Sequence, residues 1–253
     1  MTFSEFREYI PGDDIRDISW SLTARTGKVH IKKYDEEREL TTVIVVDVSG
    51  SGDFGSGKYC KGEVIVHLAA LLGFSANKNN DRVGLLTFSD RMEHYVPPKK
   101  GVAHMHRILR DLLYEKPKSN KTDLLSAISH LSSALKKQAN IFILSDFIAP
   151  ENYEKALKQL GKKHDVTAIL VRDDKEMEFP KLGGIEILDP ESGETIVLDS
   201  SSNMFQGNYK AEMRKESEAR LSLLRKSEVR LVEIPANRDY VDPLIAYFKK
   251  RHK

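Results

Sequence analysis

Oxygen-bearing side chains follow a short apolar run near residue 45. The run TTVIVV covers residues 41–46, and Asp47, Ser49 and Ser51 come directly after it in the pattern D-x-S-x-S. Because such a run predicts a buried strand, Asp47 should place its carboxylate at the carboxyl edge of a sheet. Ser49 and Ser51 are two residues apart in the loop, so their hydroxyls can reach the same point. Oxygen ligands of this kind are those that Mg²⁺ binds in proteins.

The same loop also contains a phosphate-binding pattern. Gly52–Lys58 matches G-x-x-x-x-G-K, but a P-loop needs Ser or Thr after the lysine, and Tyr59 follows it here. The carboxylate of Asp47 would also repel a phosphate. One observation favours this interpretation, since the stretch IFILSD resembles the apolar strand ending in Asp that P-loop enzymes use for Mg²⁺. A Mg²⁺-dependent phosphotransferase or NTPase that uses these loops therefore stays open as the alternative.

Two further loops could complete a metal site. KTDLLSAI places Thr122 at the start of a predicted helix, and ILSDF places Asp146 at the end of a second apolar strand. All three loops should emerge at one edge of the sheet, where α/β proteins bind their ligands. Each residue has an ordinary structural explanation, because Thr122 could cap its helix and Asp146 or the two serines could form turns. The joint pattern favours a metal site of five residues: Asp47, Ser49, Ser51, Thr122 and Asp146. Four glycines should let the first loop bend around the cation, namely Gly50, Gly52, Gly55 and Gly57, and Lys58 should begin the next helix.

These loops require a sheet with parallel strands. Further apolar runs occupy Val83–Phe88, Ile141–Leu144 and Val166–Val171, and apolar residues recur at helical spacing after Cys60 and Leu124. Strands that alternate with helices predict an α/β fold, with a mostly parallel central sheet and helices on both faces. The remaining predicted elements are a helix starting near Pro150, a charged helix over about Tyr209–Ser227, a strand at Val229–Ile234 and a last helix over about Tyr240–Lys250.

Two segments do not follow this alternation. Residues 1–40 are polar, with a predicted strand at Val29–Tyr34, and we expect them to pack on a main domain of residues 41–253. An insertion at about residues 172–200 contains IEILDPESGETIVL, in which two alternating stretches flank a turn. This pattern predicts a β-hairpin.

Composition excludes several classes of protein. The 253 residues include 40 Lys and Arg against 38 Asp and Glu, so no basic excess predicts binding to nucleic acid. One cysteine, Cys60, excludes an internal disulfide and a cysteine-rich zinc site. The sequence contains no run of 18 apolar residues, so no membrane span is predicted. The N-terminus is too charged for a signal peptide, and we therefore expect a cytoplasmic protein.

Other catalytic chemistry finds little support in the sequence. His104 and His106 are two residues apart, whereas a helical pair of metal ligands needs a spacing of four. The chain contains no G-x-S-x-G pattern of the kind that serine hydrolases use. We therefore expect a binding module that is not an enzyme.

The five residues of the expected site resemble the metal-ion-dependent adhesion site (MIDAS) of the von Willebrand factor A domain. The D-x-S-x-S loop, Thr122 and Asp146 match the five positions of that site. The resemblance implies that Ser49, Ser51 and Thr122 bind the metal directly, while the two aspartates often act through water. It implies Mg²⁺, with Mn²⁺ or Ca²⁺ as possible substitutes, and a partner protein whose Glu or Asp completes the metal shell.

A longer resemblance covers nearly the whole chain. FREYIPGDDIRDISWSLTARTGKVHIKKYDEEREL looks like the N-terminal signature of the bacterial family named "domain of unknown function 58", and FGSGKYCKGEV, DRVGLLTFSD and LVEIPANRDYVDPLIAYFKKR look like its later blocks. Gly52-Asp53 departs from that family, which often has Met after the second Ser, and Asp53 adds a negative charge near the site. The resemblance implies an adaptor for an AAA ATPase of the MoxR type in a chaperone-like or assembly process.

The N-terminal signature, Tyr9–Lys28, gathers charges around Trp20. It contains Asp13, Asp14, Arg16, Asp17 and Arg25. An interaction surface is one interpretation, because Arg and Trp are enriched among interface anchors. We favour the other, in which Arg–Asp pairs fix the segment and Trp20 is a core residue.

Overall fold

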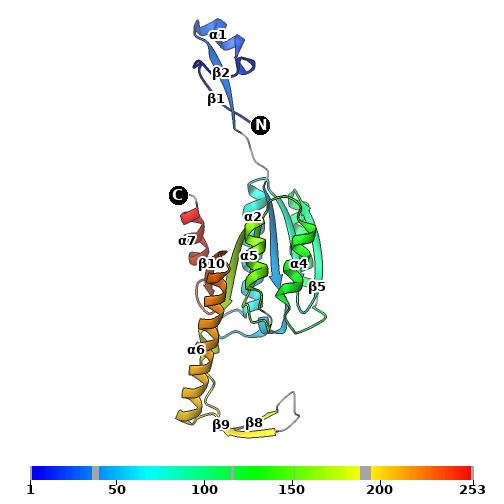
Figure 1. The fold of residues 1–253 in the computed structure, drawn as a ribbon, viewed down its shortest axis with the longest axis vertical. Helices are drawn as coiled ribbons and strands as arrows, with labels where there is room; N and C mark the ends of the chain where they lie inside the picture. The colour runs from blue at the N-terminus through cyan, green and yellow to red at the C-terminus, as the bar shows by residue number, and fades with distance from the viewer. Residues whose placement is uncertain (1, 36–39, 115–116, 151, 189–194, 252–253) are drawn as a thin grey trace. The chain divides into compact units, whose positions relative to one another are not determined.

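The computed structural model describes residues 2–35, 40–114, 117–150, 152–188 and 195–251 (Figure 1). The chain divides into two compact units, residues 1–39 and residues 40–253, and each is described by itself.

The first unit is a two-stranded antiparallel sheet with short helices between its strands. Its elements are β1 (Thr2–Glu8), the 3₁₀ turn η1 (Ile15–Asp17), α1 (Trp20–Thr26) and β2 (His30–Asp35). Strand β2 confirms the strand predicted there. The sequence did not predict β1, because three of its seven residues are charged.

Trp20 is not a core residue of this unit. Its side chain is 70% exposed, because two strands and a helix of seven residues offer too little apolar surface to enclose an indole. The ion pair between an Arg and an Asp here joins Arg7 to Asp13, with 2.6 Å between Nη2 and Oδ1. Trp20 is therefore not enclosed by its own unit, while the packing of residues 1–40 on the main domain, and with it the burial of Trp20, stays a prediction.

The second unit is built on a six-stranded sheet. Its strands are β3 (Thr41–Asp47), β4 (Arg82–Phe88), β5 (Met92–Lys99), β6 (Asn140–Ser145), β7 (Asp165–Arg172) and β10 (Arg230–Pro235). They lie in the order β10-β7-β6-β3-β4-β5, and all pairs are parallel except β4 with β5. This arrangement confirms the predicted α/β class. The edge strand β5 was missed because it contains Pro97 and Pro98, and proline is tolerated in a sheet mainly at an edge.

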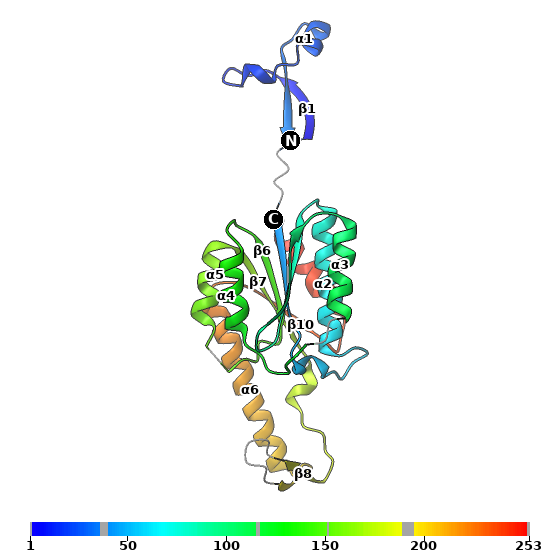
Figure 2. The same cartoon turned by 90° about the vertical axis from the view of Figure 1, so that its right-hand side faces the viewer.

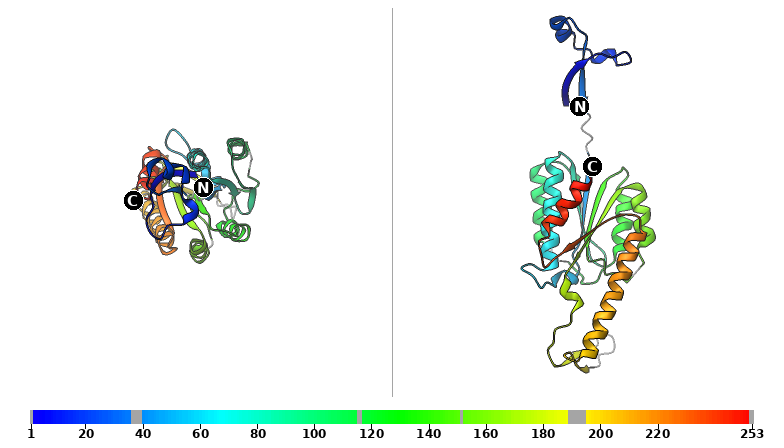
Figure 3. Two further views of the ribbon diagram at one scale, coloured as in Figure 1. Left: turned by 90° about the horizontal axis from the view of Figure 1, so that it is seen from above. Right: turned by 90° about the vertical axis from the view of Figure 1, so that its left-hand side faces the viewer.

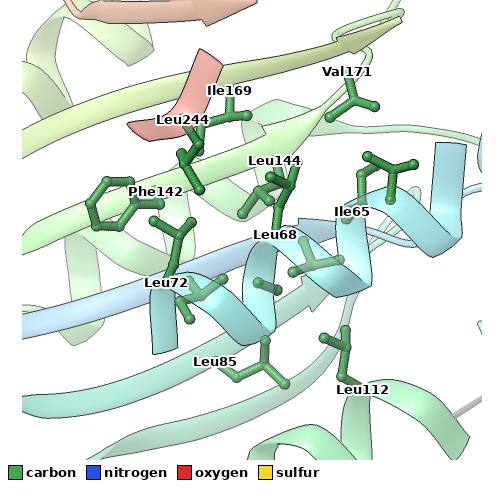
Figure 4. Close-up of a cluster of buried hydrophobic side chains, with 14 of the residues drawn as sticks. Ile65, Leu68, Leu72, Leu85, Leu112, Phe142, Leu144, Ile169, Val171 and Leu244 are labelled. Carbon is green, nitrogen blue, oxygen red and sulfur yellow. The ribbon is translucent and has the colours of Figure 1, made fainter. Parts of the chain in front are cut away.

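Helices cover both faces of the sheet (Figure 2). One face carries α2 (Lys61–Lys78), α3 (Val102–Tyr114) and α7 (Val241–Arg251), and the other carries α4 (Leu124–Ala134), α5 (Glu154–Lys163) and the C-terminal part of α6 (Asn203–Lys226). In β3, Ile44 and Val46 pack on the first face and Val43 and Val45 on the second, and all four are buried. Burial on both faces explains why the strand is apolar at successive positions. Figure 4 shows side chains of α2 packed against those of the neighbouring strands.

The insertion follows β7. It contains the 3₁₀ turn η3 (Asp174–Met177) and a hairpin of β8 (Gly184–Leu188) and β9 (Thr195–Asp199), and α6 follows it. The hairpin is confirmed, with Ile185 opposite Leu198, while its predicted turn lies outside the described residues. Helix α6 begins six residues earlier than expected, because the Ser202 hydroxyl caps it by accepting a hydrogen bond from the Phe205 amide. Figure 3 shows α6 and the hairpin extending past the end of the sheet.

Candidate metal centre

The first loop begins at the buried carboxylate of Asp47. This residue ends β3, and its Oδ1 accepts a hydrogen bond from the Ser49 amide at 2.9 Å. Its Oδ2 accepts from the hydroxyl of Ser145, the last residue of β6, at 2.6 Å. Burial raises the pKa of the Asp47 carboxyl, and the hydrogen bonds from Ser145 and Ser49 offset this only in part. The carboxylate is thus held in a fixed orientation where two parallel strands end.

The two loop hydroxyls that follow this carboxylate in the chain lie close to each other. A 3₁₀ turn, η2 (Gly50–Asp53), reverses the chain after Ser49, and the Oγ atoms of Ser49 and Ser51 are 3.1 Å apart. Ser49 is buried and Ser51 is partly buried. The hydroxyls therefore reach one point, as the two-residue spacing predicts.

The second loop lies against the first. The Gly50 amide donates a hydrogen bond to the Asn120 carbonyl at 3.1 Å, which brings the segment before α4 to the same edge of the sheet. Thr122 is partly buried in this segment. It is not the helix cap, because the Asp123 carboxylate caps α4 by accepting from the Ser126 amide at 3.0 Å. The ordinary explanation for Thr122 is thereby removed.

The third loop supplies Asp146, and its carboxylate has two protein partners. One oxygen accepts from the Ile148 amide at 3.1 Å, so Asp146 does cap the turn that follows it. The other accepts from the ammonium of Lys61 at 2.8 Å, and Lys61 also forms an ion pair with Glu176 of η3. Lys61 and Asp146 are only 2% and 3% exposed. Burial alone would lower the pKa of Lys61, but Asp146 and Glu176 outweigh burial and raise it, so the ammonium stays charged.

Sequence reasoning missed Lys61 and Glu176. Lys58 was expected to begin the helix, but α2 begins at Lys61 after Cys60. A lysine at the start of an apolar helix pattern is a weak signal for a buried charge. A buried ammonium group needs carboxylate partners, and the local sequence does not show which carboxylates these are. Glu176 gave no signal, since it lies 115 residues away in the insertion.

Two glycines of the first loop have a packing role that the sequence did not indicate. None of Gly50, Gly52, Gly55 and Gly57 has a positive φ. At Gly55 a Cβ would lie 2.5 Å from the Cα of Cys60, and at Gly57 it would lie 2.8 Å from the Cα of Asn237. Glycine is needed at these two positions because other backbone segments approach closely.

The phosphate interpretation finds an obstacle in the same loop. The amide and hydroxyl of Ser56, in the middle of the glycine-rich stretch, both donate hydrogen bonds to the Asp173 carboxylate at 2.6 Å. A phosphate would have to displace this carboxylate to use that amide. The Lys58 ammonium lies over the ring of Tyr59, 5.0 Å from its centroid.

The donor set suits a hard cation. Hydroxyl and carboxylate oxygens are the ligands of Mg²⁺, and a carboxylate oxygen that accepts one hydrogen bond keeps further acceptor capacity. Within the described ranges no cluster of three or more His, Cys, Asp or Glu could hold a metal, so a centre here depends on the hydroxyls. The residues that would hold such a cation are Ser49, Ser51 and Thr122 as direct ligands, with Asp47 and Asp146 acting through water. A cation would share Asp146 with Lys61.

Comparison with known proteins gives a family match over most of the chain. The model of the family described as "Protein of unknown function DUF58" matches residues 5–219. The Mycobacterium tuberculosis protein named "Uncharacterized protein Rv1480" is 35% identical over 191 residues, which are 75% of this chain and 60% of that protein. The chain thus spans about 60% of the length of this curated relative. A crystal structure titled "conserved hypothetical protein BatB from Bacteroides thetaiotaomicron" aligns with a TM-score of 0.54 at 16% identity, covering 84% of this chain and 98% of that one. This likeness shows a shared α/β fold, as expected.

The expected cytoplasmic location is contradicted. A structure titled "aerotolerance-related membrane protein from Bacteroides fragilis" resembles this chain with a TM-score of 0.48 at 15% identity, covering 74% of this chain and 98% of that one. The expectation rested on the lack of an apolar run in this sequence, and that lack does not assign a compartment. In the part of the chain that the structure describes, no helix is both long and apolar enough to span a bilayer.

Proposed function

The chain belongs to the DUF58 family, and from this premise we propose that it is a metal-ion-dependent protein-interaction module that binds Mg²⁺. The observation that carries the proposal is the pair of Ser49 and Ser51 hydroxyls, 3.1 Å apart in the loop that follows the buried Asp47. Mn²⁺ or Ca²⁺ could occupy the same oxygen site, because all three cations bind oxygen ligands.

The charge of the surrounding groups explains how such a centre would recognise a partner. The proposed direct ligands are neutral hydroxyls, so no ligand in direct contact with a bound cation offsets its charge. Lys61 offsets one of the two negative charges of Asp146 and Glu176, since it forms an ion pair with both. The bound cation would therefore attract a carboxylate from a Glu or Asp of the partner protein.

The identity of the partner is a further part of the proposal. The family resemblance supports an adaptor for an AAA ATPase of the MoxR type, in a chaperone-like or assembly process. The Ser56 amide, which a phosphate would need, already donates a hydrogen bond to Asp173. This contact supports a model in which the partner hydrolyses ATP and this chain does not.

Affinity capture with a tagged chain tests the proposal. We expect partners that are retained in Mg²⁺, released in EDTA and lost with Ser49→Ala. Ser129→Ala is the matched control, because Ser129 is exposed on α4 and lies outside the site. Capture of the same proteins in EDTA, or by Ser49→Ala, would refute metal-dependent recognition. Nucleotide binding by the isolated chain would instead support the phosphotransferase or NTPase alternative.

A further inference from the structure

A basic groove lies beside the candidate metal centre. Its walls come from residues 54–56 of the first loop, from residues 175–181 after β7 and from the N-terminal half of α6, and its volume is about 850 Å³. Phe54 connects the groove to the candidate metal centre, because it lines the groove and follows Ser51 by three residues. The Phe54 carbonyl accepts a hydrogen bond from the Lys61 amide at 2.8 Å, which ties this wall to the helix that carries the Lys61 ammonium.

The walls of the groove are held by specific contacts. The Gln206 side-chain amide donates to the carbonyls of Phe179 and Ser200, at 2.9 and 2.7 Å. The rings of Phe179, Phe205 and Tyr209 pack together, with Phe179 centroid distances of 5.2 and 5.3 Å to the other two. On the opposite side, Asp173 holds Ser56. The groove is therefore a preformed feature that joins the insertion to α6 and to the metal-binding loop.

The chemistry of the groove combines apolar surface with positive charge. Phe54, Met177, Phe179 and Pro180 supply the apolar part. The charged residues that line the groove are three lysines and one carboxylate, Glu178. Lys175 forms an ion pair with Glu178 at 2.7 Å. The excess positive charge thus comes from two exposed residues, Lys181 on the insertion and Lys210 on α6.

A second cavity, which Phe54 and Met177 also line, has a different charge. It has a volume of about 340 Å³, and four carboxylates line it against two guanidinium groups. These residues are Asp173, Asp174, Glu176, Glu216, Arg172 and Arg220. An acidic ligand approaching the metal centre is therefore favoured on the side of the basic groove, where the potential is complementary.

We propose that the basic groove binds an extended partner segment that combines acidic and apolar side chains, and that one carboxylate of this segment reaches the metal. The inference rests on the proposed function and specifies its partner. Apolar side chains of the segment pack on Phe54 and Phe179, and its acidic side chains pair with Lys181 and Lys210. The volume is within the range of about 300–1,000 Å³ that is typical of ligand sites.

Fluorescence anisotropy with labelled synthetic peptides tests this assignment. The probes are a peptide of alternating Glu and Leu, a peptide of Glu and Ser, and a peptide of alternating Lys and Leu, each titrated with the full chain in Mg²⁺. We expect the Glu–Leu peptide to bind most tightly and the Lys–Leu peptide not to bind. The double substitution Lys181→Glu with Lys210→Glu should weaken binding of the Glu–Leu peptide at least about tenfold, since it reverses two charges that face the ligand.

Controls separate this inference from the proposed function. Lys136→Glu with Lys137→Glu makes the same charge change on exposed residues before β6, at the opposite edge of the sheet, and should leave peptide binding unchanged. Binding lost in EDTA and in Ser49→Ala, but kept after charge reversal at Lys181 and Lys210, would overturn the groove and preserve the metal-dependent function. Binding that persists in EDTA but is lost on charge reversal would support the groove and refute the role of the metal. Absence of binding by the Glu–Leu peptide, or equal binding of the Lys–Leu peptide, would also overturn the groove.

Discussion

Replacing Lys61 with methionine tests how the buried charges of the site are balanced. The Lys61 ammonium is 2.8 Å from Asp146 and also pairs with Glu176, and both Lys61 and Asp146 are almost fully buried. Methionine retains much of the apolar stem but leaves the two carboxylates without their cation. Removing one partner of a buried ion pair costs about 3–5 kcal/mol. We expect a loss of this size in the free energy of unfolding of Lys61→Met, measured by urea denaturation in EDTA.

Mg²⁺ should then have a larger effect on the variant than on the wild type. Two unit charges 4 Å apart near a protein surface interact by about 4 kcal/mol, so removing a competing ammonium favours the cation strongly. A third of that energy, about 1.4 kcal/mol, corresponds to a tenfold lower dissociation constant. We expect Mg²⁺ to bind Lys61→Met at least about tenfold more tightly and to restore part of its lost stability.

Two matched variants make the experiment decisive. Lys61→Arg keeps the positive charge and should keep most of the stability in EDTA. Lys78→Met makes the same change on an exposed residue of the same helix, so it should affect neither stability nor metal binding. Wild-type stability of Lys61→Met in EDTA would show that the ion pair is not what holds Asp146. Unchanged or weaker Mg²⁺ binding would show that Lys61 does not compete with the cation.

Three further predictions follow from buried groups and close contacts. His164 is buried with neither ring nitrogen hydrogen-bonded, and burial lowers its pKa, so the unfolded chain binds the proton more tightly. Its contribution to stability should be complete above the ordinary pKa of about 6.5 and should be lost as the pH falls below it. His164→Phe should flatten this part of the stability–pH curve in urea denaturation, and an unchanged slope would contradict the assignment. Gly57→Ala should destabilise the chain by about 1–3 kcal/mol, because its Cβ would lie 2.8 Å from the Cα of Asn237, and wild-type stability would show that the loop yields easily. Gly207→Ala, in open space on α6, should instead stabilise the chain by up to about 1 kcal/mol in the same assay, and a loss would mean that the residue is not freely exposed.

The sheet could be predicted from the sequence because its strands are buried on both faces. Runs such as Val83–Phe88 and Val166–Val171 are apolar at most positions, and this pattern distinguishes them from helices and surface strands. Strand β5 lacks such a run and contains two prolines, so its place in the sheet depends on pairing with β4.

The places of three candidate residues in the fold could be predicted, because Asp47 ends β3, Asp146 directly follows β6 and Thr122 lies just before α4. That their loops lie at one edge follows from parallel topology, and the structure brings the first loop against both Asn120 and Ser145. Their role in binding a metal stays a prediction. The ion pair of Lys61 with Glu176 and the basic groove could not be predicted in this way. Both depend on where the insertion packs after β7, and no local pattern in the sequence specifies that position.

The most direct test of the central claim is a calorimetric titration of the chain with Mg²⁺, run in parallel on Ser49→Ala. The account predicts one binding site in the wild type. It also predicts stabilisation by about 2.7 kcal/mol when free Mg²⁺ is 100 times its dissociation constant. Ser49→Ala should lose both the binding heat and the stabilisation, while Ser129→Ala should keep both. No binding by the wild type to Mg²⁺, Mn²⁺ or Ca²⁺, or equal binding by Ser49→Ala, would contradict a metal centre built on these hydroxyls.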